Sequence, residues 1–180
     1  MIIAIEGGDQ AGKLTQSRML EEALSRDGKN VRRFDFPDYA TPVGEMIRGY
    51  LEGAREMPPQ LIHCLLSANR WEKLPEIADA ADSVVIMNRY THSNVVYGMA
   101  HGLERAWLEN LDAGLPEPKL VILLDITREE SFRRQREDRD RFEDDLEFFQ
   151  KMTAGYREMA KELGWAVIDR SEEHTSELQS

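Results

Sequence analysis

A glycine-rich turn near the start of the chain has the residue types and the spacing that bind phosphate. It follows the apolar run Ile2–Ile5 and reads GGDQAGKLT over residues 7–15. The glycines let successive backbone N–H groups turn toward phosphate oxygens, and a following helix adds the positive end of its dipole. Because the pattern G-x-x-x-x-G-K is complete, we expect it to bind the phosphates of ATP. The residues in this prediction are Gly7, Gly8, Asp9, Gln10, Ala11, Gly12, Lys13, Leu14 and Thr15.

The position after the lysine of this motif usually supplies a hydroxyl that ligates Mg²⁺. Here it is Leu14, which cannot ligate a metal, and a hydroxyl follows one residue late at Thr15. A second candidate is Asp125, which closes the apolar run Leu120–Leu124 as a Walker-B carboxylate does. A phosphate-binding loop with such a carboxylate also fits an ATPase, although the lid-like segment 133–141 follows Asp125 too closely for a typical motor domain. The absence of an Asn-Lys-x-Asp sequence argues against a GTPase.

Arginines supply the remaining candidate chemistry. Arg89 follows the apolar run Ser83–Met87, where it is either a clamp for a second phosphate or an ordinary surface arginine. Arg70, taken alone, is more typical of a solvated helix position. The segment 133–141 is dense in charges of both signs, which predicts an exposed, salt-bridged face or a lid over ATP. One lid arginine can be worth about 10³–10⁵ in the rate of phosphoryl transfer.

Alternating strand and helix patterns must position these residues. The predicted strands are 2–5, 31–36, 83–87, 120–124 and 165–168, and their short apolar runs suit a parallel sheet. Helical spacing of apolar residues covers 14–25, 61–68 and 148–159. This alternation predicts an α/β fold with right-handed crossovers, whose ligands bind at the carboxyl ends of the strands.

Composition narrows the class of protein. A chain of 180 residues fits one domain, and a formal charge of −11 argues against a nucleic-acid-binding surface. Cys64 is the single cysteine, and its apolar surroundings predict a buried, inert thiol. The first apolar run is too short for a signal peptide, and no stretch is long enough to span a membrane. We therefore expect a cytoplasmic protein.

The last eleven residues have a separate origin in this interpretation. Residues 170–180 read RSEEHTSELQS, which resembles the conceptual translation of a common sequencing adapter. We therefore expect a domain over residues 1–169, truncated at its C-terminus, followed by an artefact over residues 170–180.

Five segments occur together, and in order, in one enzyme family. They are Glu6–Lys13 with its acidic Asp9, Phe36-Pro37 followed by Thr41–Gly44, Ser67–Glu72, Asn88–Tyr90 and Asp140–Glu143. In this combination the chain resembles the thymidylate kinases, nucleoside-monophosphate kinases of the P-loop NTPase-like fold. The likeness runs from Ile2 to about Asp169. It implies a three-layer sandwich with a five-stranded parallel sheet, helices on both faces and an arginine-rich lid.

The resemblance implies transfer of the γ-phosphoryl group of ATP to dTMP, giving dTDP and ADP, with Mg²⁺ as cofactor. It gives catalytic roles to Asp9, Lys13, Arg89, Arg136 and Arg141. The residues expected to bind dTMP are Asp9, Phe36, Pro37, Leu66, Arg70, Arg89 and Tyr97. Candidate metal ligands are Thr15, Asn88 and Asp125. Members of the family are commonly homodimers, which makes a homodimer possible here.

Four positions depart from the family pattern. Leu14 replaces a hydroxyl and Asn88 replaces an aspartate, both near the expected metal. Leu66 stands where many members stack a phenylalanine on thymine, and Gly98 lies near a base-reading glutamine of many bacterial members. These departures leave two alternatives: a degenerate nucleotide-binding homologue with little catalysis, and a kinase for another nucleoside monophosphate.

Overall fold

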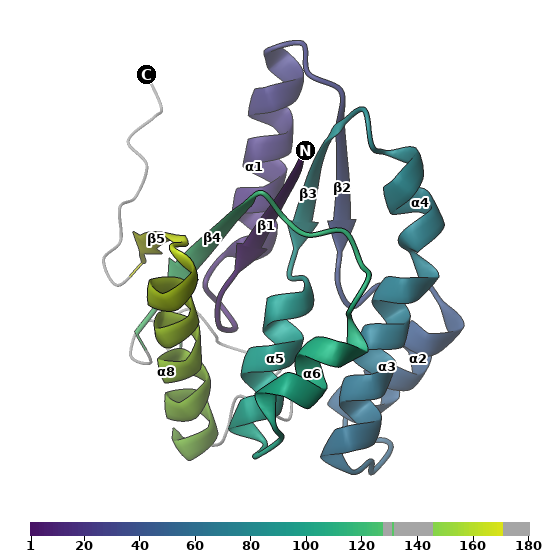
Figure 1. The fold of residues 1–180 in the computed structure, drawn as a ribbon, viewed down its shortest axis with the longest axis vertical. Coiled ribbons are helices and arrows are strands. Elements are labelled where there is room, and N and C mark those ends of the chain that lie inside the picture. Colours follow the sequence, from purple (N-terminus) through teal and green to yellow (C-terminus); the bar gives the residue numbers. More distant parts are fainter. Residues whose placement is uncertain (128–130, 132–145, 171–180) are drawn as a thin grey trace.

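Five strands form one parallel sheet in the computed structural model, which describes residues 1–127, 131 and 146–170. The strands are β1 (Ile2–Glu6), β2 (Val31–Asp35), β3 (Val84–Asn88), β4 (Leu120–Asp125) and β5 (Ala166–Asp169). Their order is β2-β3-β1-β4-β5, and every neighbouring pair is parallel (Figure 1). The five predicted strands are confirmed, each within one residue at its ends. The carboxyl ends of β1 and β3 lie side by side, with Ile5 opposite Asn88.

Seven helices are described, of which the sequence patterns indicate α1, α3 and α8. The helices are α1 (Lys13–Arg26), α2 (Pro42–Leu51), α3 (Pro59–Glu72), α4 (Leu74–Asp79), α5 (Thr91–Ala100), α6 (Arg105–Leu111) and α8 (Leu146–Leu163). The four helices that periodicity misses have ten residues or fewer, too few for a clear apolar stripe. Local capping explains one of them: the Thr41 hydroxyl accepts from Gly44 N–H at 3.0 Å, and Pro42 begins α2.

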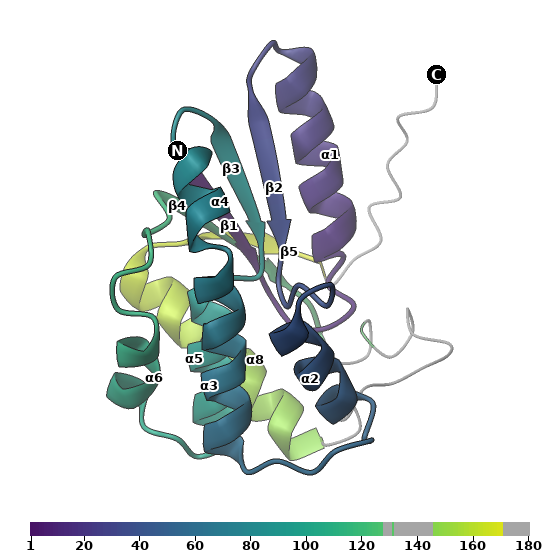
Figure 2. The same ribbon diagram turned by 90° about the vertical axis from the view of Figure 1, so that its right-hand side faces the viewer.

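Alternation along the strands divides the core into two layers. Ile5, Ile86 and Leu124 point to one face and pack with Leu20 and Leu24 of α1. On the other face, Leu123 packs with α5, α6 and α8, whereas Ala4, Val85 and Met87 pack in a cluster that includes Ile77 of α4; Figure 2 shows these helices on that side of the sheet. A strand with apolar residues at every position is buried on both faces, as parallel sheets require. The predicted three-layer α/β fold with helices on both faces is confirmed.

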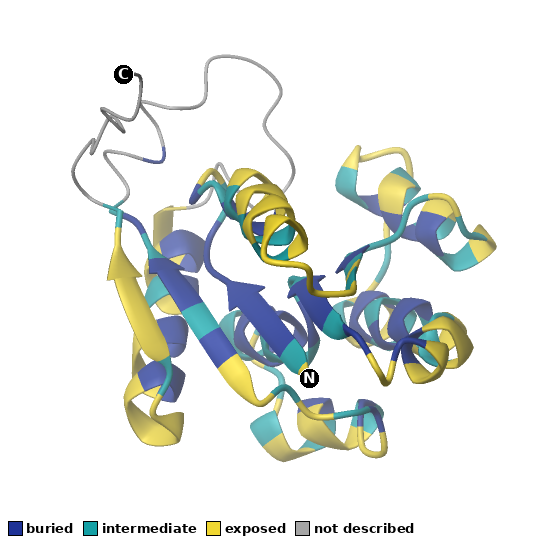
Figure 3. Ribbon diagram, turned by 90° about the horizontal axis from the view of Figure 1, so that it is seen from above, coloured by how far each residue is buried: buried dark blue, intermediate teal, exposed yellow. Residues whose placement is uncertain are grey.

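The outer strand β5 departs from this pattern. All four of its residues are exposed, with Val167 at 53% and Ile168 at 47%, and Figure 3 shows the strand exposed along its length. Among the described residues its only strand partner is β4. An apolar run of four residues therefore predicts the strand but not its position at the edge of the sheet.

The expectation of a buried thiol at Cys64 is wrong. The residue has intermediate exposure, because α3 turns Ile62 and His63 inward and carries position 64 toward the side of the helix. Cys64 is thus reachable by solvent, although no reactive role follows from this alone.

Two predicted segments lie outside the described residues. These are the arginine-rich segment 133–141, including Arg136 and Arg141, and the C-terminal residues 171–180. Of the helices that are described, none combines the length and the apolar character needed to cross a bilayer.

Candidate functional site

The phosphate-binding loop joins β1 to α1 and has the shape that its glycines allow. Gly7 adopts φ +145°, and a Cβ there would lie 2.5 Å from the carbonyl oxygen of Leu124 on β4. Gly12 adopts φ +85° and caps α1 without any side-chain hydrogen bond to the helix. The first N–H groups of α1 therefore remain available at the mouth of the loop, which is the geometry of an anion site.

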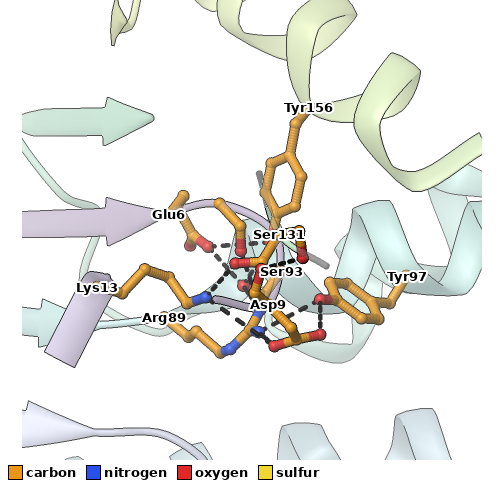
Figure 4. Close-up of polar contacts among 10 residues, drawn as sticks. Glu6, Asp9, Lys13, Arg89, Ser93, Tyr97, Ser131 and Tyr156 are labelled. Atoms are coloured by element: carbon orange, nitrogen blue, oxygen red, sulfur yellow. Dashed lines mark hydrogen bonds and ion pairs between the residues drawn. The ribbon is translucent and has the colours of Figure 1, made fainter. Parts of the chain in front are cut away.

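Lys13 lies inside the loop rather than in solvent. Its ammonium group donates to the carbonyl oxygen of Gly8 at 2.5 Å and lies 4.0 Å from an Asp9 carboxylate oxygen (Figure 4). Because the lysine is buried against its own loop, its charge is already placed where phosphate oxygens would arrive. A bound phosphate could replace the Gly8 carbonyl as its acceptor.

Arg89 brings the end of β3 to the same point. It adopts φ +61°, a left-handed conformation that costs a non-glycine residue about 1–3 kcal/mol, and such residues cluster at functional sites. Its guanidinium donates to an Asp9 carboxylate oxygen, to the carbonyl of Gly7 at 3.3 Å and to the hydroxyl of Tyr97 at 3.2 Å. Tyr97 donates to the other Asp9 oxygen at 2.8 Å. The strained backbone thus aims one arginine at the loop.

The electrostatics of this group keep both partners charged. Burial alone raises the pKa of the Asp9 carboxyl, but the positive charges of Arg89 and Lys13 outweigh it and the net pKa is lowered. Burial likewise lowers the pKa of Arg89, but Asp9 reverses this and the net pKa is well above its usual value. Burial raises the pKa of Tyr97, which stays a neutral donor.

A fully buried carboxylate, Glu6, is linked to Arg89 through the Ser93 hydroxyl, to which Arg89 Nη1 donates at 3.4 Å. It accepts from the backbone N–H of Tyr90 at 3.0 Å and from the Ser93 hydroxyl at 2.5 Å. Burial raises its pKa, but His92, the Ser93 hydroxyl and the charge of Arg89 together leave the net pKa lowered. Sequence reasoning gave Glu6 no role of its own, although an acidic residue ending a buried apolar strand is itself a signal.

Arg70 is not a solvated helix arginine. It is 3% exposed, and it holds Asp112 through two hydrogen bonds, of 3.2 Å from Nε and 2.6 Å from Nη2. The same carboxylate accepts from the Ser67 hydroxyl at 2.7 Å. A bidentate ion pair of this kind fixes the plane of the guanidinium group, so the Arg70 side chain has one defined orientation. Asp112 lies far away in sequence and carries no motif, and sequence reasoning missed it.

One cavity, of about 120 Å³, brings Asp9, Arg70, Arg89 and Tyr97 together. All seven residues predicted to bind the acceptor line it, although they come from five separate segments of the chain. The cavity adjoins the phosphate-binding loop through Asp9 and Arg89. The other lining residues are Tyr39, Leu51, Ile62, Tyr90, Ser93 and Asn94.

Comparison with known proteins gives the family. The sequence profile named thymidylate kinase matches residues 5–180. The chain belongs to the thymidylate kinase family. Its relatives include the thymidylate kinases of Dictyostelium discoideum, 32% identical over 100% of this chain and 83% of that protein, and of Homo sapiens, 32% identical over 93% and 82%. A solved structure of thymidylate kinase from Candida albicans superposes with a TM-score of 0.77 at 31% identity, covering 93% of this chain and 82% of that one.

Leu66 and Gly98 both depart from the thymidylate kinase pattern, but the two positions lie in different surroundings. Leu66 lines the cavity, so a change at this position alters the space that the acceptor would occupy. Gly98 does not line it. A Cβ at Gly98 would collide with the side chain of Leu108 on α6. The interpretation of Gly98 as a lost base contact is therefore wrong, because this glycine permits close packing of α5 against α6.

The three candidate metal ligands of this family member are not equivalent. Asn88 donates through Nδ2 to Asp35 at 2.9 Å, and its buried Oδ1 has no hydrogen-bond partner. Asp125 accepts from Arg157 at 2.8 Å. Thr15 is exposed on α1 and lies about 100° around the helix axis from position 14. Among the described residues no three His, Cys, Asp or Glu side chains gather to hold a metal. Of the three, Asn88 is the residue whose side-chain oxygen is buried without a hydrogen-bond partner.

Proposed function

We propose that this chain transfers the γ-phosphoryl group of ATP to dTMP, giving dTDP and ADP. Family membership supports this activity, and one observation of the structure carries it: Asp9 of the phosphate-binding loop is hydrogen-bonded to Arg89, and both residues line the neighbouring cavity. A donor triphosphate on the loop and an acceptor monophosphate in the cavity would then meet at this pair. Such a meeting point is what in-line phosphoryl transfer needs.

On the donor side, the loop backbone from Gly7 to Thr15 and the ammonium of Lys13 would bind the phosphates of ATP. The uncapped first turn of α1 supplies N–H donors, and Lys13 lies within reach without leaving the loop. These groups are positioned before ATP arrives, so they stabilise charge in the transition state with little reorganisation.

On the acceptor side, Arg89 and Arg70 would hold the phosphate of dTMP, with Phe36, Pro37, Leu66 and Tyr97 around the nucleoside. Asp9 would orient Arg89 and the acceptor sugar. The attacking atom is a phosphate oxygen of dTMP, which is ionised at neutral pH and needs no general base. The structure agrees with this requirement, since Asp9 is committed to Arg89 and Tyr97.

The chemistry that Mg²⁺ supplies when bound is neutralisation of charge on the β- and γ-phosphates. Asn88 would hold it through its unpartnered Oδ1, with Asp125 and Thr15 as further candidate ligands through water. Arg136 and Arg141 belong to the proposal as lid residues that neutralise charge in the transition state. A homodimer through α3 is a further part of it, supported by the exposed Leu61 on that helix.

The experiment is an ADP-release assay with ATP, Mg²⁺ and a panel of dTMP, dUMP, dCMP and dGMP. We expect dTMP to give the highest kcat/KM. The panel matters because the C. albicans relative is described by its broad substrate specificity. A different best acceptor would overturn dTMP as substrate. Binding of ATP without turnover of any acceptor would overturn the assignment as a kinase.

A further inference from the structure

Behind the acceptor cavity, three polar side chains form a continuous hydrogen-bonded chain. His63 lies on α3, Asn94 on α5 and His101 just after α5. The Nδ1 atom of His63 is 2.7 Å from Oδ1 of Asn94, and its Nε2 atom is 3.0 Å from Nδ1 of His101. His63 is 1% exposed and Asn94 is 2% exposed. No part of the proposed reaction uses the two histidines.

One backbone atom sets the direction of every hydrogen bond in this chain. The carbonyl oxygen of His63 can only accept, and the Asn94 amide nitrogen donates to it at 3.2 Å. The Asn94 nitrogen therefore lies on that side, and its oxygen turns to Nδ1 of His63. Two acceptors cannot share a hydrogen bond, so Nδ1 of His63 must carry a proton.

The second ring nitrogen follows from the charge state of His63. Burial lowers the pKa of His63 to about 4, and the nearby His101 and Arg70 act in the same direction while the bond to Asn94 opposes them. Burial also lowers the pKa of His101, whose ring packs 4.7 Å from that of Phe148. A neutral His63 with its proton on Nδ1 has an acceptor at Nε2. His101 must therefore donate from its own Nδ1, which fixes both tautomers.

The hydrogen bonds to His63 leave one N–H of the Asn94 side chain unused. Its Oδ1 accepts from His63, and one of its two Nδ2 protons goes to the His63 carbonyl. Among the described residues the second Nδ2 proton has no acceptor, and Asn94 lines the cavity. One N–H of Asn94 is thus left for a ligand in this cavity, whereas its carbonyl oxygen is already paired with His63.

We propose that His63, held by His101, is a positioning residue that fixes the Asn94 amide so that it donates a hydrogen bond to the acceptor nucleotide. The matching chemistry is a nucleotide with an oxygen or nitrogen acceptor atom facing α5. The inference rests on the proposed function for the identity of the nucleotide, but not for the arrangement of the three side chains.

Nuclear magnetic resonance tests the arrangement without any activity. The imidazole ¹⁵N shifts of His63 are expected to show a neutral ring protonated on Nδ1 at pH 6. Addition of dTMP is expected to shift one of the two Nδ2 protons of Asn94. A ring protonated on Nε2, or both Asn94 amide protons unmoved by saturating dTMP, would overturn the proposal.

Two matched variants test the consequence. In His63→Asn the amide nitrogen stands at the same number of bonds from Cα as Nδ1, so it can still donate to Asn94. His63→Gln has a similar polarity and size but moves its amide one bond further. We expect His63→Gln to raise KM for dTMP about tenfold, with kcat and KM for ATP little changed, and His63→Asn to restore KM to within about twofold.

Equal KM values for dTMP in folded His63→Gln and wild type would contradict the positioning role while leaving the proposed function intact. Loss of dTMP turnover in the wild type would instead contradict the proposed function, and the histidine tautomers would still be measurable. If His63→Gln does not fold, the resonance experiment decides the matter alone.

Discussion

Asp9 and Arg89 form a charge-assisted hydrogen bond although 80 positions separate them in the chain. Asp9 belongs to the loop after β1 and Arg89 directly follows β3, and the parallel pairing of these strands brings their carboxyl ends together. Tyr97 closes the group by bonding to both. The pair therefore depends on the sheet as a whole, and each residue holds the other in place.

Replacing Asp9 by asparagine is expected to weaken both binding and stability. The variant keeps the shape of the side chain but leaves Arg89 and Lys13 without a compensating charge. Since both partners are partly exposed, we expect a loss of about 1–3 kcal/mol in the free energy of unfolding. We expect kcat/KM for dTMP to fall about 100-fold. Urea unfolding and steady-state kinetics measure the two effects.

Glu147→Gln is the matched control for this variant. It removes a carboxylate from the exposed Glu147–Lys151 pair, so we expect the free energy of unfolding to fall by less than about 0.5 kcal/mol and kcat/KM to stay unchanged. An Asp9→Asn enzyme as active as this control would show that the pair has no part in catalysis.

Two substitutions toward the family pattern are expected to change the response of the protein to Mg²⁺ in different ways. Leu14→Ser adds a hydroxyl at an exposed position of the first turn of α1 and should lower the Mg²⁺ concentration for half-maximal activity about threefold to tenfold. Asn88→Asp places a second carboxylate beside Asp35, where an amide now donates at 2.9 Å. Like charges at this distance repel, so its Tm should fall without Mg²⁺ and recover with it.

Leu14→Ala is the control, because it removes the leucine without adding a ligand. Mg²⁺ titrations of activity and of Tm provide the measurements. Identical metal dependence in Leu14→Ser and Leu14→Ala would refute the argument that the missing hydroxyl limits Mg²⁺ binding.

The buried His63 is expected to make stability depend on pH. Its pKa is about 4 in the folded protein and 6.5 ordinarily, so between these values the unfolded chain binds a proton that the folded protein does not. The contribution of His63 to the free energy of unfolding should therefore be fully present above about pH 6.5 and be lost as the pH falls toward 4. The full contribution is about 3 kcal/mol. The difference in the free energy of unfolding between wild type and His63→Asn, measured at each pH, separates the effect of His63 from that of the carboxyl groups. If the two proteins show the same dependence on pH, His63 is not buried as a neutral ring.

Substitutions at Leu66 and at Gly98 are expected to have different effects. Leu66→Phe adds an aromatic ring inside the cavity, so we expect KM for dTMP to fall about twofold to tenfold. Gly98→Gln would force a side chain into Leu108 and should destabilise the fold by about 1–3 kcal/mol without changing acceptor preference. The acceptor panel and thermal unfolding measure both. Leu65→Phe, a partly buried neighbour that does not line the cavity, is the control for Leu66→Phe.

Much of the fold follows from local patterns, because short apolar runs and glycine turns act within a few residues. The strands, α1 and the phosphate-binding loop are of this kind. Lys13 follows from its place in the loop motif, and Arg89 follows from its place after a strand. The sequence could not show that Arg70 is buried against Asp112 or that Gly98 packs on Leu108, because both depend on partners remote along the chain. For the same reason the chain from His101 through His63 to Asn94 carries no motif.

The contact of Gly7 with the Leu124 carbonyl has a thermodynamic consequence. The loop packs closely against the neighbouring strand β4, so its conformational entropy is lost when the protein folds rather than when a nucleotide binds. Association then requires little further ordering of the chain, and more of the attraction between amides and phosphates remains as affinity. A side chain at this position would push the loop off its support and make every encounter with a nucleotide begin from a disordered segment.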